Sequence, residues 1–223
     1  MKVKICGITE KEDALRAVEL GVDALGFIFA PSPRQVSMEK ARRIIKAIPP
    51  FVKTVGVFVN EKTNKIREHI NHCGLDLVQL HGDESPEFCR DLMPYSLKAF
   101  RIKDDSSLQM CAGYQANVRA LLLDTYAADK AGGTGKTFDW QLAVKIRETG
   151  IPVILSGGLG PSNIQEAIRV VRPYAVDVNS GVEERPGKMS YVMMTELMVK
   201  VAGIEKMNFE HRTLGVRCSM FSL

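Results

Sequence analysis

The chain has 223 residues, a length that allows one large domain or two small ones. Apolar residues make up 45% and charged residues 25%, which is ordinary for a soluble globular protein that can bury a sizeable core. The net charge of +4 is modest and its basic residues are scattered, so a nucleic-acid partner is not expected.

The five cysteines form no C-x-x-C pair and no zinc-like group with histidine, so neither a disulfide framework nor a metal site is expected. The sequence also shows no signal peptide and no long apolar run. We therefore expect a cytoplasmic protein that does not enter a membrane.

Short apolar runs alternate with helix-like stretches along the chain. We expect strands near residues 3–7, 24–29, 54–59, 77–81, 97–101, 120–124, 152–156 and 175–179. Helices are expected near residues 10–20, 37–48, 63–73, from 85, and over 139–148, 164–171 and 190–201, with a weaker helical pattern towards 115.

The arrangement of these runs predicts the fold class. The runs are mostly continuous rather than alternating, as is typical of strands buried on both faces. Helices between them require parallel strands joined by right-handed crossovers. Eight such units favour a single-domain (β/α)8 TIM barrel over residues 1–203, and an open doubly wound sheet is the alternative. Residues 204–223 lack periodicity and are interpreted as a poorly ordered C-terminal extension, with an extra helix as the alternative.

Cys6 follows the first predicted strand. Thr9 and Glu12 match a capping box, which predicts a helix N-terminus just after the cysteine. At the end of a parallel strand, Cys6 is either a small packing residue or a reactive thiol at a ligand site. We expect the helix N-terminus and cations such as Lys4 or Arg34 to favour its thiolate.

Glycine turns follow the seventh and eighth predicted strands. Gly157 and Gly158, and then Ser180 and Gly181, stand where barrels frequently bind phosphate through backbone N–H groups. The alternative is that they are only tight turns. The segment 132–137 resembles a nucleotide P-loop but lacks its first glycine, so we expect a loop over the site instead.

Two more polar residues end predicted strands. Asp124 follows three leucines, and it is either a helix cap or a partly desolvated acid. Facing Cys6 across a barrel mouth, it would complete an acid and base pair for proton transfer. His81 would either orient a substrate or bond a carbonyl.

Together, these motifs resemble the phosphoribosylanthranilate isomerase family. The resemblance runs in order from Lys4 to about Gly203. The motifs that carry it are Lys4-Ile5-Cys6-Gly7-Ile8-Thr9, Ser32-Pro33-Arg34, Val55-Gly56-Val57-Phe58, Gln79-Leu80-His81-Gly82, Leu123-Asp124, Gly132-Gly133-Thr134-Gly135 with Phe138-Asp139-Trp140, Gly157-Gly158-Leu159 and the segment 176–183.

The resemblance implies an enzyme with a phosphoribosyl small-molecule substrate. It would catalyse the Amadori rearrangement of N-(5-phosphoribosyl)anthranilate, the third step from chorismate to tryptophan, with Cys6 as general base and Asp124 as general acid. No cofactor or metal is implied, and the chain would be a monomer or homodimer. The substrate-binding residues implied are Arg34 at the anthranilate moiety, His81, Gly133, Gly135, Gly157, Gly158, Asp177, Ser180 and Gly181.

The sequence departs from the family pattern at two positions. Asn179 stands where the family usually has Ser, and Ser190 stands where it usually has Asp. Because both flank the phosphate end and Ser can cap a helix, we expect activity to survive.

Two other functions stay open. A related sugar-phosphate lyase or epimerase would use the same barrel, although an epimerase should show several metal-binding histidines. A non-catalytic phosphosugar-binding barrel would be favoured by loss of Cys6 or Asp124, and both are present.

Overall fold

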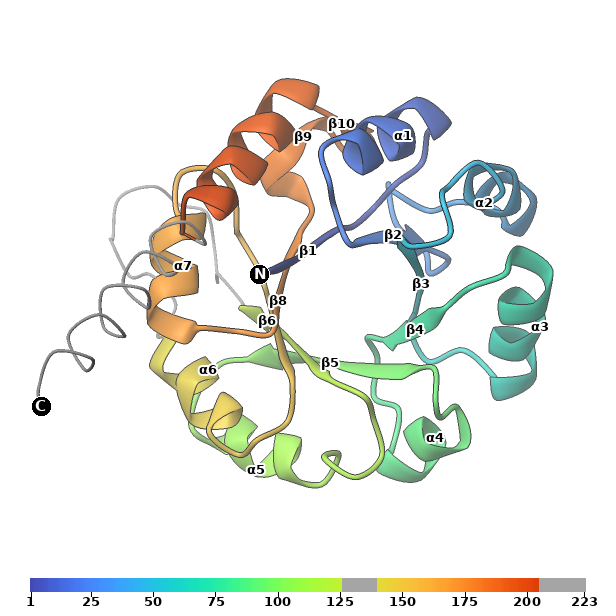
Figure 1. The fold of residues 1–223 in the computed structure, drawn as a ribbon. Coiled ribbons are helices and arrows are strands. Elements are labelled where there is room, and N and C mark those ends of the chain that lie inside the picture. Colours follow the sequence, from blue (N-terminus) through green and yellow to red (C-terminus); the bar gives the residue numbers. More distant parts are fainter. Residues whose placement is uncertain (126–139, 205–223) are drawn as a thin grey trace, which may run out of the picture.

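The computed structural model describes residues 1–125 and 140–204, and it forms a ring of helices around a closed barrel of parallel strands (Figure 1). The barrel strands are β1 (Lys2–Ile5), β2 (Ala24–Ile28), β3 (Lys53–Phe58), β4 (Leu77–Leu80), β5 (Ser96–Ile102), β6 (Leu121–Thr125), β7 (Val153–Ser156) and β8 (Ala175–Val178).

Seven described helices lie between successive barrel strands in the chain, as expected, and another follows the last strand. They are α1 (Lys11–Glu19), α2 (Met38–Ile45), α3 (Thr63–Cys73), α4 (Pro86–Asp91), α5 (Ser106–Ala112), α6 (Trp140–Arg147), α7 (Ile164–Val171) and a last helix over residues 191–204. After β8 come a short 3-10 helix, η1 (Ser180–Val182), and the antiparallel strands β9 (Glu183–Arg185) and β10 (Lys188–Met189).

The barrel prediction is confirmed, and the open sheet is excluded, because the first strand has a partner on both sides. Lys4 of β1 is in parallel register with Ala24 of β2 and with Asp177 of β8. The remaining neighbours pair in chain order up to β8. The carboxyl ends of all eight strands therefore meet at one mouth, where the functional groups of this fold gather.

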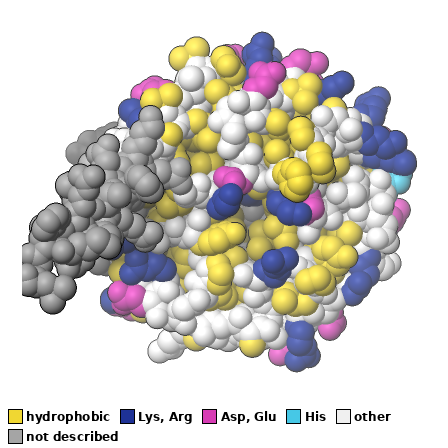
Figure 2. Space-filling model, in the orientation of Figure 1, with side chains coloured by type: hydrophobic (Ala, Val, Ile, Leu, Met, Phe, Trp, Pro, Cys, Tyr) yellow, Lys and Arg dark blue, Asp and Glu magenta, His cyan; other side chains and the backbone are white. Residues whose placement is uncertain are grey.

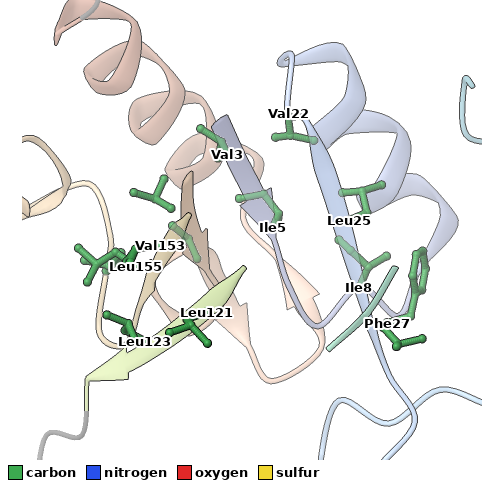
Figure 3. Packing of buried hydrophobic residues seen from close by; sticks show 14 of the residues in the cluster. Val3, Ile5, Ile8, Val22, Leu25, Phe27, Leu121, Leu123, Val153 and Leu155 are labelled. Atoms are coloured by element: carbon green, nitrogen blue, oxygen red, sulfur yellow. The ribbon is translucent and has the colours of Figure 1, made fainter. Parts of the chain in front are cut away.

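Alternate residues of each strand point to opposite sides of the barrel wall. Outward-facing side chains of β1, β2, β6 and β7 pack into the layer between strands and helices, as Figure 3 shows for Val3, Ile5, Leu25, Leu121 and Leu155. A second, smaller apolar cluster fills the barrel interior with Val55, Leu97, Ala99, Ala120, Leu122, Ile154 and Ala175. Polar side chains on that same inward face are thereby held in a rigid wall.

The predicted capping box at Thr9 and Glu12 is wrong. Helix α1 begins at Lys11, and its N-cap residue Glu10 makes no side-chain capping bond. The Thr9 hydroxyl instead donates to the Gly187 carbonyl over 2.5 Å, which ties the loop after β1 to the β9–β10 hairpin. A tertiary partner competes successfully with the local helix end for the same hydroxyl group.

Other helix starts follow the sequence signals. The Ser37 and Ser85 hydroxyls accept backbone N–H bonds at the starts of α2 and α4, and Pro86 stands at the first position of α4. Ser190 caps the last helix by accepting from the Met193 N–H over 3.4 Å, so the departure at Ser190 retains a capping function. The weakly predicted helix before residue 115 is real, as α5.

The surface mixes charges of both signs. On the face shown in Figure 2, Lys and Arg side chains lie among Asp and Glu rather than in one basic patch. In the parts of the chain that the structure covers, no helix combines the length and apolarity needed to cross a membrane. The predictions for the loop at 132–137 and for the extension after Ile204 lie outside the described residues.

Candidate active site

A cavity of about 240 Å³ opens at the carboxyl ends of the strands. It brings together most of the predicted site residues: Cys6, Arg34, His81, Asp124, Gly157, Gly158, Asp177 and Ser180. Gly181 follows directly in η1 but does not line the cavity, and Gly133 and Gly135 lie outside the described residues. Residues from six different strand ends or following loops therefore converge, although they are far apart in the sequence.

Cys6 lies one residue beyond β1 and is held by backbone contacts. Its N–H donates to the Val178 carbonyl of β8 over 2.9 Å, and Gly7 turns the chain away with a φ of +80°. A Cβ on Gly7 would lie 2.9 Å from both the Arg34 side chain and Asn179, so only glycine fits this turn. The thiol is thus fixed in the wall, only 4% exposed.

The protonation of Cys6 differs from the sequence-based expectation. Burial raises the pKa of the Cys6 thiol, Lys4 lowers it, and Asp177 raises it further, with a net shift upward. The neighbouring cation therefore favours the thiolate as expected, but the net shift of the pKa is upward because burial outweighs it. Lys4 acts as predicted, but desolvation is larger, and the helix N-terminus at Lys11 lies five residues away along the chain.

Lys4 is a buried ammonium at the centre of the site. Its Nζ donates to Asp177 Oδ1 over 2.9 Å and to Gln79 Oε1 over 3.0 Å. Burial alone would lower the pKa of Lys4, but Asp177 and Cys6 outweigh it and raise the value. Asp177 also accepts from the Ser156 hydroxyl over 3.4 Å, so its carboxylate is engaged by the protein itself.

His81 and Asp124 face each other across the mouth. His81 Nε2 lies 3.5 Å from Asp124 Oδ2, and within residues 1–125 and 140–204 this buried nitrogen has no closer hydrogen-bond partner. On its other side the ring nitrogen Nδ1 lies 3.2 Å from Gln79 Nε2. Asp124, part of β6 with a side chain 32% exposed, is a carboxyl group that lines the cavity.

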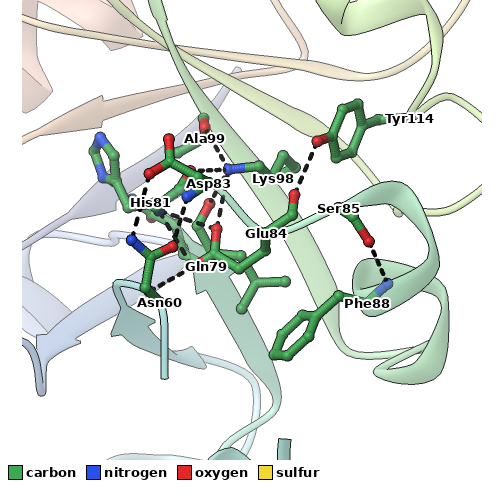
Figure 4. Close-up of polar contacts among 12 residues, drawn as sticks. Asn60, Gln79, His81, Asp83, Glu84, Ser85, Phe88, Lys98, Ala99 and Tyr114 are labelled. Atoms are coloured by element: carbon green, nitrogen blue, oxygen red, sulfur yellow. Dashed lines mark hydrogen bonds and ion pairs between the residues drawn. The ribbon is translucent and has the colours of Figure 1, made fainter. Parts of the chain in front are cut away.

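The loop that carries His81 is fixed by a second buried ion pair (Figure 4). Lys98 Nζ of β5 lies 3.1 Å from Glu84 Oε2 and also donates to the Gly82 carbonyl over 2.6 Å. Glu84 in turn accepts from the Asn60 and Gly82 N–H groups. Because both charges are almost fully buried and multiply bonded, the segment after β4 has one well-defined position.

Arg34 is oriented by a residue that the sequence analysis did not single out. Its Nε and Nη2 donate to the two carboxylate oxygens of Glu183 over 2.7 and 2.6 Å. This bidentate pair raises the pKa of Arg34 and fixes the plane of the guanidinium at the cavity edge. The Gly187 N–H donates a hydrogen bond to Oε1 of the same Glu183 carboxylate over 2.9 Å.

The two glycine turns have different reasons for being glycine. Gly157 and Gly158 have φ values of +89° and +61°, and the Cβ side of Gly158 is open space. Gly181 is required because a Cβ there would collide with the Leu159 carbonyl of the neighbouring turn. The loops after β7 and β8 are therefore packed backbone to backbone, which places both turns beside the same cavity.

Three polar side chains that bond the predicted site residues were missed or understated in the sequence reasoning: Lys4, Gln79 and Glu183. Lys4 and Gln79 stand two residues before Cys6 and His81, so strand alternation places each pair on the same inward face. That spacing was the available signal. Within residues 1–125 and 140–204, no three His, Cys, Asp or Glu side chains group closely enough to hold a metal ion, so this region lacks the histidine set expected of the epimerase alternative.

Comparison with known proteins identifies the family. The family model described as N-(5'-phosphoribosyl)anthranilate (PRA) isomerase matches residues 3–200. The chain belongs to this family. It is 52% identical over 199 residues to the N-(5'-phosphoribosyl)anthranilate isomerase of Geobacter metallireducens, with 89% of this chain and 97% of the relative covered.

Solved structures of family members agree with the fold. Phosphoribosyl anthranilate isomerase from Thermotoga maritima is 45% identical, with a TM-score of 0.84 over 91% of this chain and 99% of that one. Another isomerase structure, 42% identical with a TM-score of 0.82 and the same coverage, is a complex with reduced 1-(o-carboxyphenylamino)-1-deoxyribulose 5-phosphate. The resemblance seen in the sequence motifs is thereby confirmed.

Proposed function

We propose that Cys6 is the general base and Asp124 the general acid of the aldose–ketose isomerisation of N-(5'-phosphoribosyl)anthranilate. This Amadori rearrangement in tryptophan biosynthesis is the reaction of the family to which the chain belongs. The observation that carries the assignment is the shared cavity: a thiol after β1 and a carboxyl group on β6 line one space between them.

The reaction opens with one proton delivered and one removed, and a second such exchange completes it. Asp124 protonates the ribose ring oxygen as the C1–O bond breaks, and the anthranilate nitrogen lone pair forms a C1=N bond. The Cys6 thiolate then removes the proton from C2, and those electrons form the C1=C2 bond of an enolamine. The enolamine gains a proton at C1 and loses one from its hydroxyl oxygen to give the ketone. The substrate nitrogen donates its lone pair when the ring opens and takes an electron pair back from the C1=N bond when C2 loses its proton.

Charge complementarity supports an orientation for the substrate. Arg34, with its plane fixed by Glu183, suits the carboxylate or ring of the anthranilate moiety. Gly157, Gly158, Ser180 and Gly181 suit the phosphate, since their turns lie at the same cavity. Asp177 acts through Lys4, and His81 lines the cavity beside Asp124.

The test uses the purified protein with phosphoribosylanthranilate generated in place, whose fluorescence is lost on isomerisation. We expect turnover by the natural sequence and a loss of at least about 10²-fold in Cys6→Ala and in Asp124→Ala, the scale of a lost acid–base group. Undiminished turnover in both variants would exclude the mechanism. No turnover by the natural sequence would instead favour a phosphosugar-binding barrel without catalysis.

The protein is further proposed to be a homodimer rather than a monomer. A solved structure of a relative from Thermotoga maritima is described as generated monomers of a dimeric isomerase. Phe51, in the segment between α2 and β3, is 95% exposed and is the position chosen to test this proposal. Sedimentation should show Phe51→Asp to be a monomer, while Val199→Asp on the last helix, 66% exposed, should sediment as the natural sequence does.

The cytoplasm is the proposed location. The cysteine count is odd, and the four cysteines within the described residues are free thiols. Reduced thiols of this kind are typical of a reducing compartment.

A further inference from the structure

The site contains an unbroken series of polar contacts from one side of the barrel to the other. Asp177 of β8 bonds Lys4 of β1, Lys4 bonds Gln79 of β4, Gln79 bonds His81, and His81 faces Asp124 of β6. The proposed function uses Asp177 through Lys4, and His81 beside Asp124. Gln79, which is 2% exposed, joins them and has no role in the mechanism as written.

The chemistry of Lys4 decides how the Gln79 amide is oriented. An ammonium group has three donors and no acceptor, so the atom that faces Lys4 over 3.0 Å must be the amide oxygen. The reversed amide would set N–H groups against the ammonium in a buried site, which is unfavourable. Lys4 is itself fixed as a donor by its bond to Asp177.

The orientation of Gln79 in turn decides the tautomer of His81. With its oxygen on Lys4, Gln79 presents its NH2 group to His81 Nδ1 over 3.2 Å. Nδ1 must then offer a lone pair, so the ring is neutral and its proton is on Nε2. That nitrogen is buried, 3.5 Å from the Asp124 carboxyl oxygen, and has no closer partner among the described residues.

We propose that Gln79 is a positioning residue that fixes His81 as its neutral Nε2–H tautomer and thereby presents a hydrogen-bond donor to Asp124. This inference rests on the proposed function, in which Asp124 gives its proton to the ring oxygen. An N–H facing the carboxyl group stabilises the negative charge that forms as the proton leaves. The other tautomer would place a lone pair there and would draw the Asp124 proton towards itself and away from the substrate.

The direct test is a long-range proton–nitrogen NMR correlation on the full chain with 15N-labelled histidine, without substrate. His81 is assigned as the signal missing in His81→Asn. We expect Nδ1 to have the 15N chemical shift of an unprotonated ring nitrogen, and Nε2 that of a protonated one. In Gln79→Glu, both side-chain oxygens are acceptors, so Nδ1 should become protonated. In Gln79→Met, which is similar in length and makes neither bond, the His81 shifts should move towards a mixture of tautomers.

Activity supplies the second readout. We expect kcat of Gln79→Met to fall by about tenfold or more with little change in KM, and the melting temperature shows whether each variant is folded. A protonated Nδ1 in the natural sequence, or unchanged His81 shifts in both variants, would overturn the proposal. Turnover by Asp124→Asn would show that Asp124 is not the general acid of the proposed function. The NMR measurement on substrate-free protein would still decide, independently, whether Gln79 fixes the tautomer of His81.

Discussion

Lys4 and Asp177 are register partners across β1 and β8, and their side chains form an ion pair of 2.9 Å inside the barrel. Both side chains are about 95% buried, at 4% and 5% exposure. Such a pair is costly to break from one side, because the remaining charge stays buried without a partner. The pair is therefore both a structural element of the barrel and the origin of the electrostatic field at Cys6.

The first prediction concerns the loss of one partner of this buried ion pair. Lys4→Met should lower the free energy of unfolding by about 3–5 kcal/mol, because Asp177 is left uncompensated. The double variant Lys4→Met/Asp177→Asn should recover most of that loss. The control is Lys2→Met, whose ion pair with Asp23 is largely exposed and should contribute less than about 1 kcal/mol. Urea unfolding measures all three; equal losses in the single and double variants would contradict the prediction.

The second prediction concerns pH. Because burial raises the pKa of the Cys6 thiol above its ordinary value of 9.0, the thiol form dominates at neutral pH. The base needs the thiolate, and the thiolate fraction of Cys6 should rise by about tenfold per pH unit through the neutral range and should still be rising at pH 9. The ultraviolet absorbance of the thiolate, taken as the difference between the natural sequence and Cys6→Ser, measures that fraction directly. An ascending limb complete below pH 8 would contradict this protonation state.

The third prediction tests a close approach that no motif revealed. A Cβ on Gly26 of β2 would lie 2.6 Å from Cys6 Sγ and 3.1 Å from Lys4 Cε. Gly26→Ala should therefore displace the thiol, with a loss of about tenfold or more in kcat/KM and about 1–3 kcal/mol in stability. Gly113→Ala is the matched control, since its nearest atom would be 3.9 Å away. Equal activity of the two variants would show that the thiol tolerates the displacement.

Much of this site followed from the sequence, for a physical reason. Apolar runs of strand length separated by helices predict parallel strands, and parallel strands bring Cys6 and Asp124 to one mouth. Strand alternation could also have paired Lys4 with Cys6. The glycine turns were found because consecutive glycines are visible in the sequence.

Other features depend on tertiary contacts that have no local pattern. Thr9 bonds the Gly187 carbonyl, 178 residues away, instead of capping α1. The net shift in the Cys6 pKa depends on burial, which motifs do not measure. The pairing of Arg34 with Glu183 joins the loop after β2 to the hairpin after β8, and only the closed barrel brings these segments together.

The last prediction concerns that pairing. Glu183 accepts from Arg34 through both oxygens, and Gly187 N–H shares one of them. In Glu183→Gln the side chain keeps its shape, but one oxygen becomes an NH2 group that cannot accept, so the guanidinium loses half of its bidentate contact. If Arg34 binds the anthranilate moiety, KM should rise several-fold while kcat changes less, because the proton-transfer pair is untouched. The neighbouring Glu184→Gln, at an exposed position, is the control and should behave as the natural sequence. A fall in kcat at constant KM in Glu183→Gln would place Arg34 with the reacting atoms instead of the substrate's far end.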